Sequence, residues 1–299
     1  MSEQAREAPE VVHGDDLCIR DPGGDGRAAI ASPEVDHAPP ADPDGLDRML
    51  EPATDALLAA AALDEGEAVL DIGCGCGATT FSAAHAVGRS GAVYGIDVTP
   101  SMLNIARTRL ASSALPNVTL TTADAQTDRL PGPADIAISR FGTMFFDDPV
   151  VAFANIRRAL RPGGRLCFAT WQPLDANAWL VIPGAALLRW ITLPELDGAG
   201  PGMFSQSEPA ALAVTLAAAG FDDIEAQPIK LALPIGADAE EALVRLADTG
   251  VGRAALDAVP APTRDAAQDA VRAALAEHQG TEGVRLGAAI LVTTARSRT

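Results

Sequence analysis

The chain has 299 residues, enough for one elaborated α/β domain with a large buried core. Its 22 basic and 40 acidic residues give a formal net charge of −18. This charge disfavours binding to nucleic acid or to an anionic membrane, because both need an excess of Lys and Arg. No apolar run reaches about 18 residues, so we expect no membrane-spanning helix. The polar N-terminus lacks the apolar core of a signal peptide, so we expect a cytoplasmic protein.

The cysteines and histidines indicate no metal site. None of the four cysteines lies in a C-x-x-C pair, and the four histidines are scattered without metal-ligand spacing. We therefore expect neither a bound metal nor a disulfide framework.

The N-terminal part of the chain divides into a tail and a helical segment. Residues 1–40 are rich in Asp, Glu, Pro and Gly and contain few large apolar residues, so we expect a flexible acidic tail. Residues 45–63 have a helical pattern, in which Pro52 either interrupts the helix or opens a second one. We assign residues 41–299 to one domain.

Strand-like and helix-like segments alternate from residue 66, which indicates βαβ units and a parallel sheet. The expected strands are 67–72, 91–98, 117–125, 134–141 and 165–171. The expected helices between them are 78–87, 101–112 and 149–160.

The pattern changes after residue 171. Residues 172–207 are rich in Pro, Gly and Ala, and we expect this insertion and 236–260 to cap a substrate. Further helices are predicted over 209–220, 238–258 and 261–279, and strands over 222–234 and 283–297. A late antiparallel strand commonly completes a mostly parallel sheet. The predicted fold is thus a Rossmann-like, doubly wound α/β fold with a mostly parallel seven-stranded sheet, N-terminal helices and an inserted helical lid.

The most informative motif is D-I-G-C-G-C-G, which ends the first predicted strand and opens a helix. Gly73, Gly75 and Gly77 allow unusual φ values and let a ligand lie against the backbone at a helix N-terminus. The glycines also match the dinucleotide fingerprint G-x-G-x-x-A, so a nicotinamide cofactor is one candidate. Asp71 argues against a nicotinamide cofactor and in favour of a cationic ligand, because a carboxylate repels a pyrophosphate and attracts a cation.

This loop and the segments after it resemble the class I S-adenosylmethionine-dependent methyltransferases, especially the group similar to ubiquinone and menaquinone methyltransferases. The resemblance covers about residues 66 to 171 and rests on several motifs in order, ending with the L-R-P-G-G-R-L turn into the fifth strand. It implies S-adenosylmethionine as the cofactor. The implied cofactor-binding residues are Asp71, Gly73, Cys74, Gly75, Gly77, Asp97, Val98, Met102, Asp124, Ala125, Ser139, Arg140 and Phe141.

The resemblance also implies a role for each part of this set. The glycine loop would wrap the methionine and ribose, and Asp97 would accept from both ribose hydroxyls. Met102 would pack on the adenine, while Asp124 and the N–H of Ala125 would bind its polar edge. The residues from Ser139 onwards would face the reactive end. Dinucleotide folds also place an acid like Asp97 about 20 residues after the glycines. Asp71 and Asp124 therefore distinguish S-adenosylmethionine from a dinucleotide better than Asp97 does.

The residues around the reactive centre have alternative interpretations. Arg140 either contacts cofactor or substrate or pairs with an acidic helix. Trp171 either shapes the substrate pocket, together with Phe145, or covers the core. No catalytic residue is assigned, although His37 and Arg140 are candidates. In methyl transfer, positioning can supply much of the catalysis, and a base is needed only when the nucleophile must lose a proton.

The resemblance implies in-line transfer of a methyl group to O, N or C of a small, fairly apolar metabolite, such as a secondary metabolite or a quinone-like compound. Three alternatives stay open at this point. They are an S-adenosylmethionine-binding biosynthetic enzyme that transfers no methyl, an NAD(P)-dependent oxidoreductase, and a non-catalytic interaction module. The expected partner is a small molecule, and a homodimer is one assembly to consider.

Overall fold

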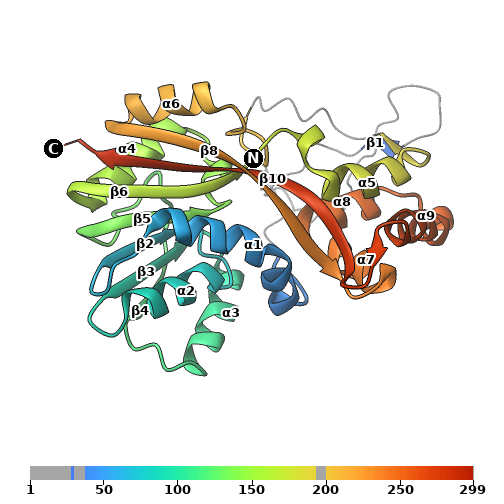
Figure 1. Ribbon diagram of the computed structural model, residues 1–299, viewed down its shortest axis with the longest axis horizontal. Coiled ribbons are helices and arrows are strands. Elements are labelled where there is room, and N and C mark those ends of the chain that lie inside the picture. Colours follow the sequence, from blue (N-terminus) through green and yellow to red (C-terminus); the bar gives the residue numbers. More distant parts are fainter. Residues whose placement is uncertain (1–27, 30–37, 193–199, 299) are drawn as a thin grey trace, which may run out of the picture.

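The structure is a computed structural model that describes residues 28–29, 38–192 and 200–298. A central sheet has the strand order β4-β3-β2-β5-β6-β10-β8 (Figure 1). Strand β10 runs antiparallel to both of its neighbours, and the pairs among β4, β3, β2, β5 and β6 are all parallel. The predicted mostly parallel sheet with a late antiparallel strand is therefore confirmed. Among the described residues it has eight strands instead of the predicted seven, because the short β9 (Gln279–Gly280) also pairs with β10. Its other strands are β2 (Ala68–Ile72), β3 (Ala92–Asp97), β4 (Val118–Thr122), β5 (Ala134–Arg140), β6 (Leu160–Trp171), β8 (Phe221–Gly236) and β10 (Gly283–Ser297).

Helices cover both faces of this sheet, as Figure 1 shows. One face carries α1 (Pro43–Ala61), α2 (Ala78–Val87) and α3 (Pro100–Ala111), and the other carries α4 (Pro149–Ala159) and α6 (Pro209–Ala218). Successive strand residues alternate between the two cores: Val69 belongs to the same core as Leu57 of α1, and Leu70 to the same core as Phe153 of α4. No helix in the described part of the chain is long and apolar enough to cross a membrane.

Helix α1 passes through Pro52 without ending. A proline inside a helix removes one backbone hydrogen bond. Met49 and Leu57, on either side of Pro52, are fully buried against the sheet, so tertiary packing holds the helix together across that defect. The N-terminus is capped by Asp42, whose carboxylate accepts from the N–H of Gly45 at 2.9 Å.

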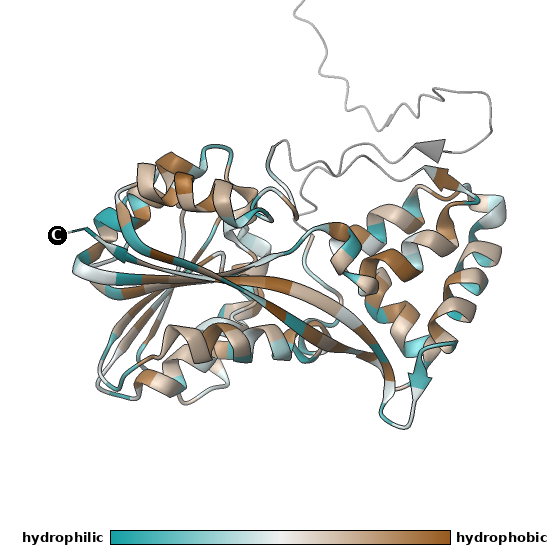
Figure 2. Ribbon diagram, turned by 45° about the horizontal axis from the view of Figure 1, so that its top comes forward, coloured by the Kyte–Doolittle hydropathy of each residue, from teal (hydrophilic) through white to brown (hydrophobic). Residues whose placement is uncertain are grey.

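Strands β8 and β10 are long, and apolar residues continue along them as they leave the core (Figure 2). The chain between them forms α7 (Ala239–Ala247), α8 (Gly250–Asp257), the 3-10 turn η3 (Ala261–Thr263), α9 (Arg264–Ala276) and β9 (Gln279–Gly280), which pairs with β10. The helix predicted over 238–258 is thus two helices. The first ends at Ala247 with Asp248 as its C-cap, and Thr249 caps the second, since its hydroxyl accepts from Gly252 N–H.

The segment that follows β6 adds further elements on the same side of the molecule as α7 to α9. They are η2 (Leu174–Ala176), α5 (Ala178–Leu187) and β7 (Ile191–Thr192), which pairs with β1 (Ala28–Ala29). Helix α5 packs against α9. The inserted helices therefore gather beside the sheet (Figure 1), and their role as a substrate cap stays a prediction.

Candidate functional site

The loop between β2 and α2 has three glycines in the left-handed region, with φ of 66° at Gly73, 54° at Gly75 and 93° at Gly77. A Cβ on Gly73 would lie 2.9 Å from Gly142 Cα, and one on Gly77 would lie 2.6 Å from the ring of Phe81. A Cβ on Gly75 would have no atom within 4 Å. Gly73 and Gly77 are therefore needed for packing, whereas the space beside Gly75 is free for a ligand.

Asp97 holds this loop from the end of β3. Its Oδ2 accepts from Gly75 N–H at 2.8 Å and its Oδ1 accepts from Thr99 N–H at 2.8 Å. Each carboxylate oxygen has a second acceptor position, so Asp97 can still accept from two vicinal hydroxyls. The neighbouring Cys74 is anchored through its backbone, because its N–H donates to Ile96 O at 2.9 Å. Burial raises the pKa of the Cys74 thiol, so the side chain stays protonated.

Asp71 lies fully buried on β2, under α1 and α2. Its Oδ2 accepts from the Thr80 hydroxyl at 2.6 Å, while its Oδ1 has no hydrogen-bond partner among the described residues. Burial raises the pKa of Asp71 to about 7, even though the Thr80 hydrogen bond and the charge of Arg140 lower it. A buried carboxylate with a free oxygen favours a cationic ligand group and disfavours a pyrophosphate.

Apolar side chains lie beside the loop on its α3 side. Met102, in the first turn of α3, is half-buried, and its Sδ lies 3.6 Å from Cys76 Sγ. Val98 follows Asp97 directly and leaves 53% of its surface exposed, which is unusual for a large apolar residue. These two residues offer apolar contact area next to the ribose-binding candidate Asp97.

Asp124 and Ala125 follow β4, the neighbour of β3. Asp124 is half-buried, and its Oδ1 accepts from Gln126 N–H at 2.7 Å. Ala125 is buried, and its carbonyl accepts from Asn155 Nδ2 at 2.9 Å. This turn is therefore held in place at the same edge of the sheet as Asp97. Its contact with an adenine stays a prediction.

The residues at the carboxyl end of β5 use their side chains within the protein. The Ser139 hydroxyl donates to Ile72 O at 2.7 Å and accepts from Gly142 N–H at 3.2 Å. It holds the β5 loop against the end of β2, where Gly142 meets Gly73. The hydroxyl thus has a structural role, and it keeps one acceptor position to which a cofactor N–H or O–H could donate. That cofactor contact stays a prediction.

Arg140 is buried beneath α1 and pairs with that helix. Its Nη1 donates to Thr54 Oγ1 at 2.7 Å, and its Nη2 lies 3.5 Å from Asp47 Oδ1. Burial lowers the pKa of Arg140 while Asp47 and Asp71 raise it, and a guanidinium stays protonated in proteins. Of the two interpretations of Arg140, the structure thus shows the one in which it pairs with an acidic helix, α1. A direct contact with cofactor or substrate stays a prediction.

A second arginine, Arg109, which was not predicted from sequence, also lies at this site. Arg109, near the end of α3, donates from Nη1 to Cys76 O at 2.9 Å. Its Nη2 donates to Asp44 Oδ1 and to Asp47 Oδ2, both at 2.6 Å. Asp47 therefore lies between Arg109 and Arg140. Since these partners lie 33 to 65 residues from Arg109 in the chain, no local sequence pattern points to them.

Three aromatic rings extend from the site towards the inserted helices. Phe141, at φ 66°, stacks on Trp171 with ring centroids 4.1 Å apart, and Trp171 lies 5.1 Å from Trp179 of α5. Trp171 is only 3% exposed, so it does cover the core. Phe145, in the 3-10 turn η1 (Thr143–Phe145), is 37% exposed. The predicted role of Trp171 and Phe145 in lining a substrate pocket stays a prediction.

Among the described residues, no histidine is placed to act as a general base at the site. The candidate His37 lies outside the described residues, and the two histidines within them, His85 and His278, are exposed on α2 and after α9. The described residues contain no group of three side chains that could hold a metal ion.

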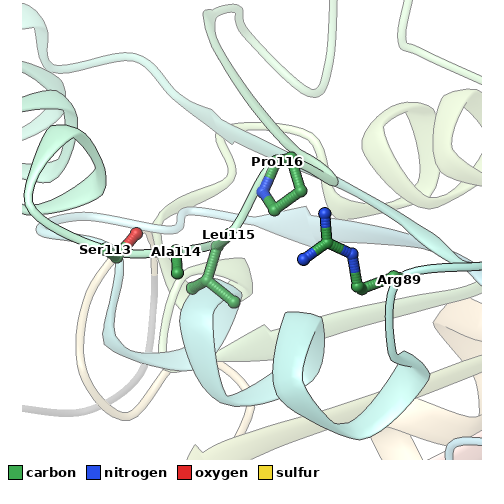
Figure 3. Close-up of a pocket in the computed structure, with 5 residues that line it drawn as sticks. All are labelled: Arg89, Ser113, Ala114, Leu115 and Pro116. Atoms are coloured by element: carbon green, nitrogen blue, oxygen red, sulfur yellow. The ribbon is translucent and has the colours of Figure 1, made fainter.

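Figure 3 shows a surface hollow lined by five residues. Its lining residues precede β3 and β4, so it lies at the amino ends of these strands, whereas the glycine loop lies at the carboxyl ends. The residues that line it are Arg89, Ser113, Ala114, Leu115 and Pro116. It is therefore not the cofactor site.

Comparison with known proteins gave matches to methyltransferases. A family model described as a methyltransferase domain matches residues 69–164. Nocamycin O-methyltransferase from Saccharothrix syringae is 31% identical over 193 residues, which are 60% of this chain and 67% of that protein. Aklanonic acid methyltransferase DauC from Streptomyces sp. (strain C5) is 41% identical over 106 residues, or 35% of this chain. The chain spans about half the length of DauC (48%) and 44% of a demethylmenaquinone methyltransferase from Lactococcus lactis.

Solved structures show the same fold. The YcgJ protein from Bacillus subtilis superposes with a TM-score of 0.52 at 16% identity, covering 83% of this chain and 98% of that one. Phosphoethanolamine N-methyltransferase 2 from Haemonchus contortus, in complex with S-adenosylmethionine, gives 0.52 at 17% identity, covering 86% and 56%. At such identities the likeness concerns the fold alone.

Proposed function

The chain belongs to the S-adenosylmethionine-dependent methyltransferase family, and on this premise we propose that it transfers a methyl group to an O, N or C atom of a small, fairly apolar molecule. The observation that carries the proposal is the fit between the glycine loop and a cationic, ribose-containing cofactor. Asp71 has a free, buried oxygen, Gly75 borders open space, and Asp97 has two spare acceptor positions.

Each of these groups would hold a different part of the cofactor. Asp71 would bind the ammonium group, because a buried carboxylate gains most from a positive partner. Asp97 would accept from the two ribose hydroxyls, and Asp124 with Ala125 would bind the polar edge of the adenine. Met102 and Val98 would pack against the adenine ring.

The bound cofactor supplies a methyl group that its sulfonium already activates. The protein then has to orient the acceptor in line and exclude water. Helix α1 covers this part of the sheet, with Arg140 beneath it. The stacked rings of Phe141 and Trp171 form a rigid wall that leads towards the inserted helices. No base is assigned, since an acceptor that is already nucleophilic needs none.

The named substrates of relatives support a secondary-metabolite or quinone-like acceptor. Those names are nocamycin, aklanonic acid and demethylmenaquinone. The inserted helices would close over such a molecule from the side of Trp179. Cytoplasmic location and a homodimeric assembly stay predictions.

The test begins with calorimetric titration of the full chain with S-adenosylhomocysteine. The wild type should bind, and Asp97→Ala should bind more than about tenfold more weakly, because it loses the ribose acceptor and the tie to Gly75. The exposed Asp55→Ala removes the same charge from the outside of α1 and serves as the matched control.

Mass spectrometry of reactions with quinone-like and polyketide-like acceptors should then show a gain of one CH2 group. Failure of the wild type to bind S-adenosylhomocysteine would refute the proposal. A product without that mass gain would favour the biosynthetic enzyme that binds S-adenosylmethionine and transfers no methyl.

A further inference from the structure

We propose that Arg109 is a positioning residue for cofactor binding, which acts by holding the Cys76 carbonyl of the glycine loop, with Asp44 and Asp47 of α1 holding the arginine in turn. This inference rests on the proposed function, because it assigns a role to Arg109 in the same cofactor site. It starts from contacts that no motif of the glycine loop predicts.

A loop with three glycines needs external ties to keep one conformation, because glycine loses more backbone freedom on ordering than any other residue. Three consecutive residues of the loop provide these ties. Cys74 N–H donates to Ile96 O, Gly75 N–H donates to the Asp97 carboxylate, and Cys76 O accepts from Arg109 Nη1. The first two ties lead to β3, and the third leads to α3.

The Arg109 tie fixes one particular peptide plane. The C=O of Cys76 and the N–H of Gly77 belong to the same planar trans unit, so they point in opposite directions. Arg109 binds the carbonyl at 2.9 Å, and Cys74 O accepts from Gly77 N–H at 2.9 Å. These two bonds hold the plane from both sides and close the turn that contains Gly75, which borders the open space of the cofactor site.

The guanidinium is itself held rigidly. Asp44 and Asp47 both accept from Nη2, and Asp47 uses its second oxygen towards Arg140. The Arg109 side chain is only 26% exposed, and that of Asp47 is 20% exposed, so screening by salt is reduced. A fixed arginine fork loses little entropy in each bond that it makes. Arg109 therefore orders the loop before the cofactor arrives, which lowers the cost of binding.

The experiment compares Arg109→Gln with Arg107→Gln in the full chain, by calorimetric titration with S-adenosylhomocysteine. Arg107 lies on the same helix and donates to Asn104 at the exposed surface, so its loss removes the same charge without touching the loop. We expect Arg109→Gln to raise the Kd about tenfold, the effect of one charge-assisted hydrogen bond. Arg107→Gln should stay within about twofold of the wild type. Arg109→Lys should be intermediate, because an ammonium group cannot serve the carbonyl and both carboxylates as a fork does.

Urea unfolding of each free variant separates this role from a merely structural one. Reversible unfolding raises the apparent Kd only by the inverse of the folded fraction, so an about tenfold rise in a variant that is more than about nine tenths folded reports a change at the site itself. If Arg109→Gln binds as tightly as Arg107→Gln, the proposal is overturned. If Arg109→Gln does not fold, Arg109→Lys decides: a Kd raised by about threefold or more supports the proposal, and the wild-type Kd overturns it. A wild type that does not bind would instead refute the proposed function itself.

Discussion

The protonation of Asp71 should make cofactor binding depend on pH. Burial raises the pKa of Asp71 to about 7, so this carboxyl is mostly neutral slightly below neutral pH and mostly ionised slightly above it. Only the ionised form attracts the ammonium group of S-adenosylhomocysteine. The affinity should therefore increase as the pH rises from about 6 to about 8, and binding near pH 7 should release a proton.

The magnitude follows from the fraction of binding-competent protein. One unit below its pKa, about a tenth of the carboxyl is ionised, and one unit above, about nine tenths. The apparent Kd is the intrinsic Kd divided by this fraction, so it should fall about tenfold across the interval. The change should be centred near the pKa of Asp71, far above that of an exposed aspartate.

Calorimetric titration at several pH values measures this dependence, and buffers with different ionisation enthalpies report the proton released. Asp71→Asn keeps the shape and an acceptor for the Thr80 hydroxyl, but it cannot ionise. Its affinity should be weaker and should not change across the interval. An unchanged wild-type Kd from about pH 6 to about pH 8, or the same pH dependence in Asp71→Asn, would refute the reasoning.

The same variant checks the raised pKa through stability. The native state keeps the Asp71 proton at pH values where the unfolded chain has lost it. The resulting stabilisation is present below the unfolded pKa and is lost as the pH rises through about 7. The difference in free energy of unfolding between wild type and Asp71→Asn should therefore shift against the wild type between about pH 4 and pH 7, by several kcal/mol in chemical denaturation.

Three further substitutions have distinct expected results. Gly75→Ala fills the open space beside the loop, so S-adenosylhomocysteine titration should show at least about tenfold weaker binding. The Tm should fall by only about 2–4 °C, the cost of one alanine in the left-handed region at φ 54°; unchanged binding would place the ligand elsewhere. Gly73→Ala forces a Cβ against Gly142 and should lower the Tm by several degrees; an unchanged Tm would contradict the packing role. Trp171→Ala removes a buried, stacked ring and should lower the free energy of unfolding by about 3–5 kcal/mol, measured in urea; a loss below about 1 kcal/mol would show that the ring is not a core residue.

The strand–loop–helix unit around the glycine motif was predictable from sequence, because its determinants are local. Short apolar runs define β2 and β3, and glycines permit the turn between β2 and α2. Asp71 and Asp97 each end up at the carboxyl edge of the sheet because parallel strands share that edge. The last strand was likewise predictable from its apolar run after the last helical segment, and its antiparallel direction from a known variation on mostly parallel sheets.

The surroundings of the loop were decided by tertiary structure. Arg140 had two interpretations in sequence, and only the packing of α1 over β5 brought Thr54 within 2.7 Å of its guanidinium, from 86 residues away. The partners of Arg109 could not be predicted from sequence for the same reason, since a long flexible cation can pair with any carboxylate in an acidic chain. Local sequence specifies backbone conformation, but which charges meet depends on how helices cross the sheet, and that crossing is set by the burial of side chains distant in the chain.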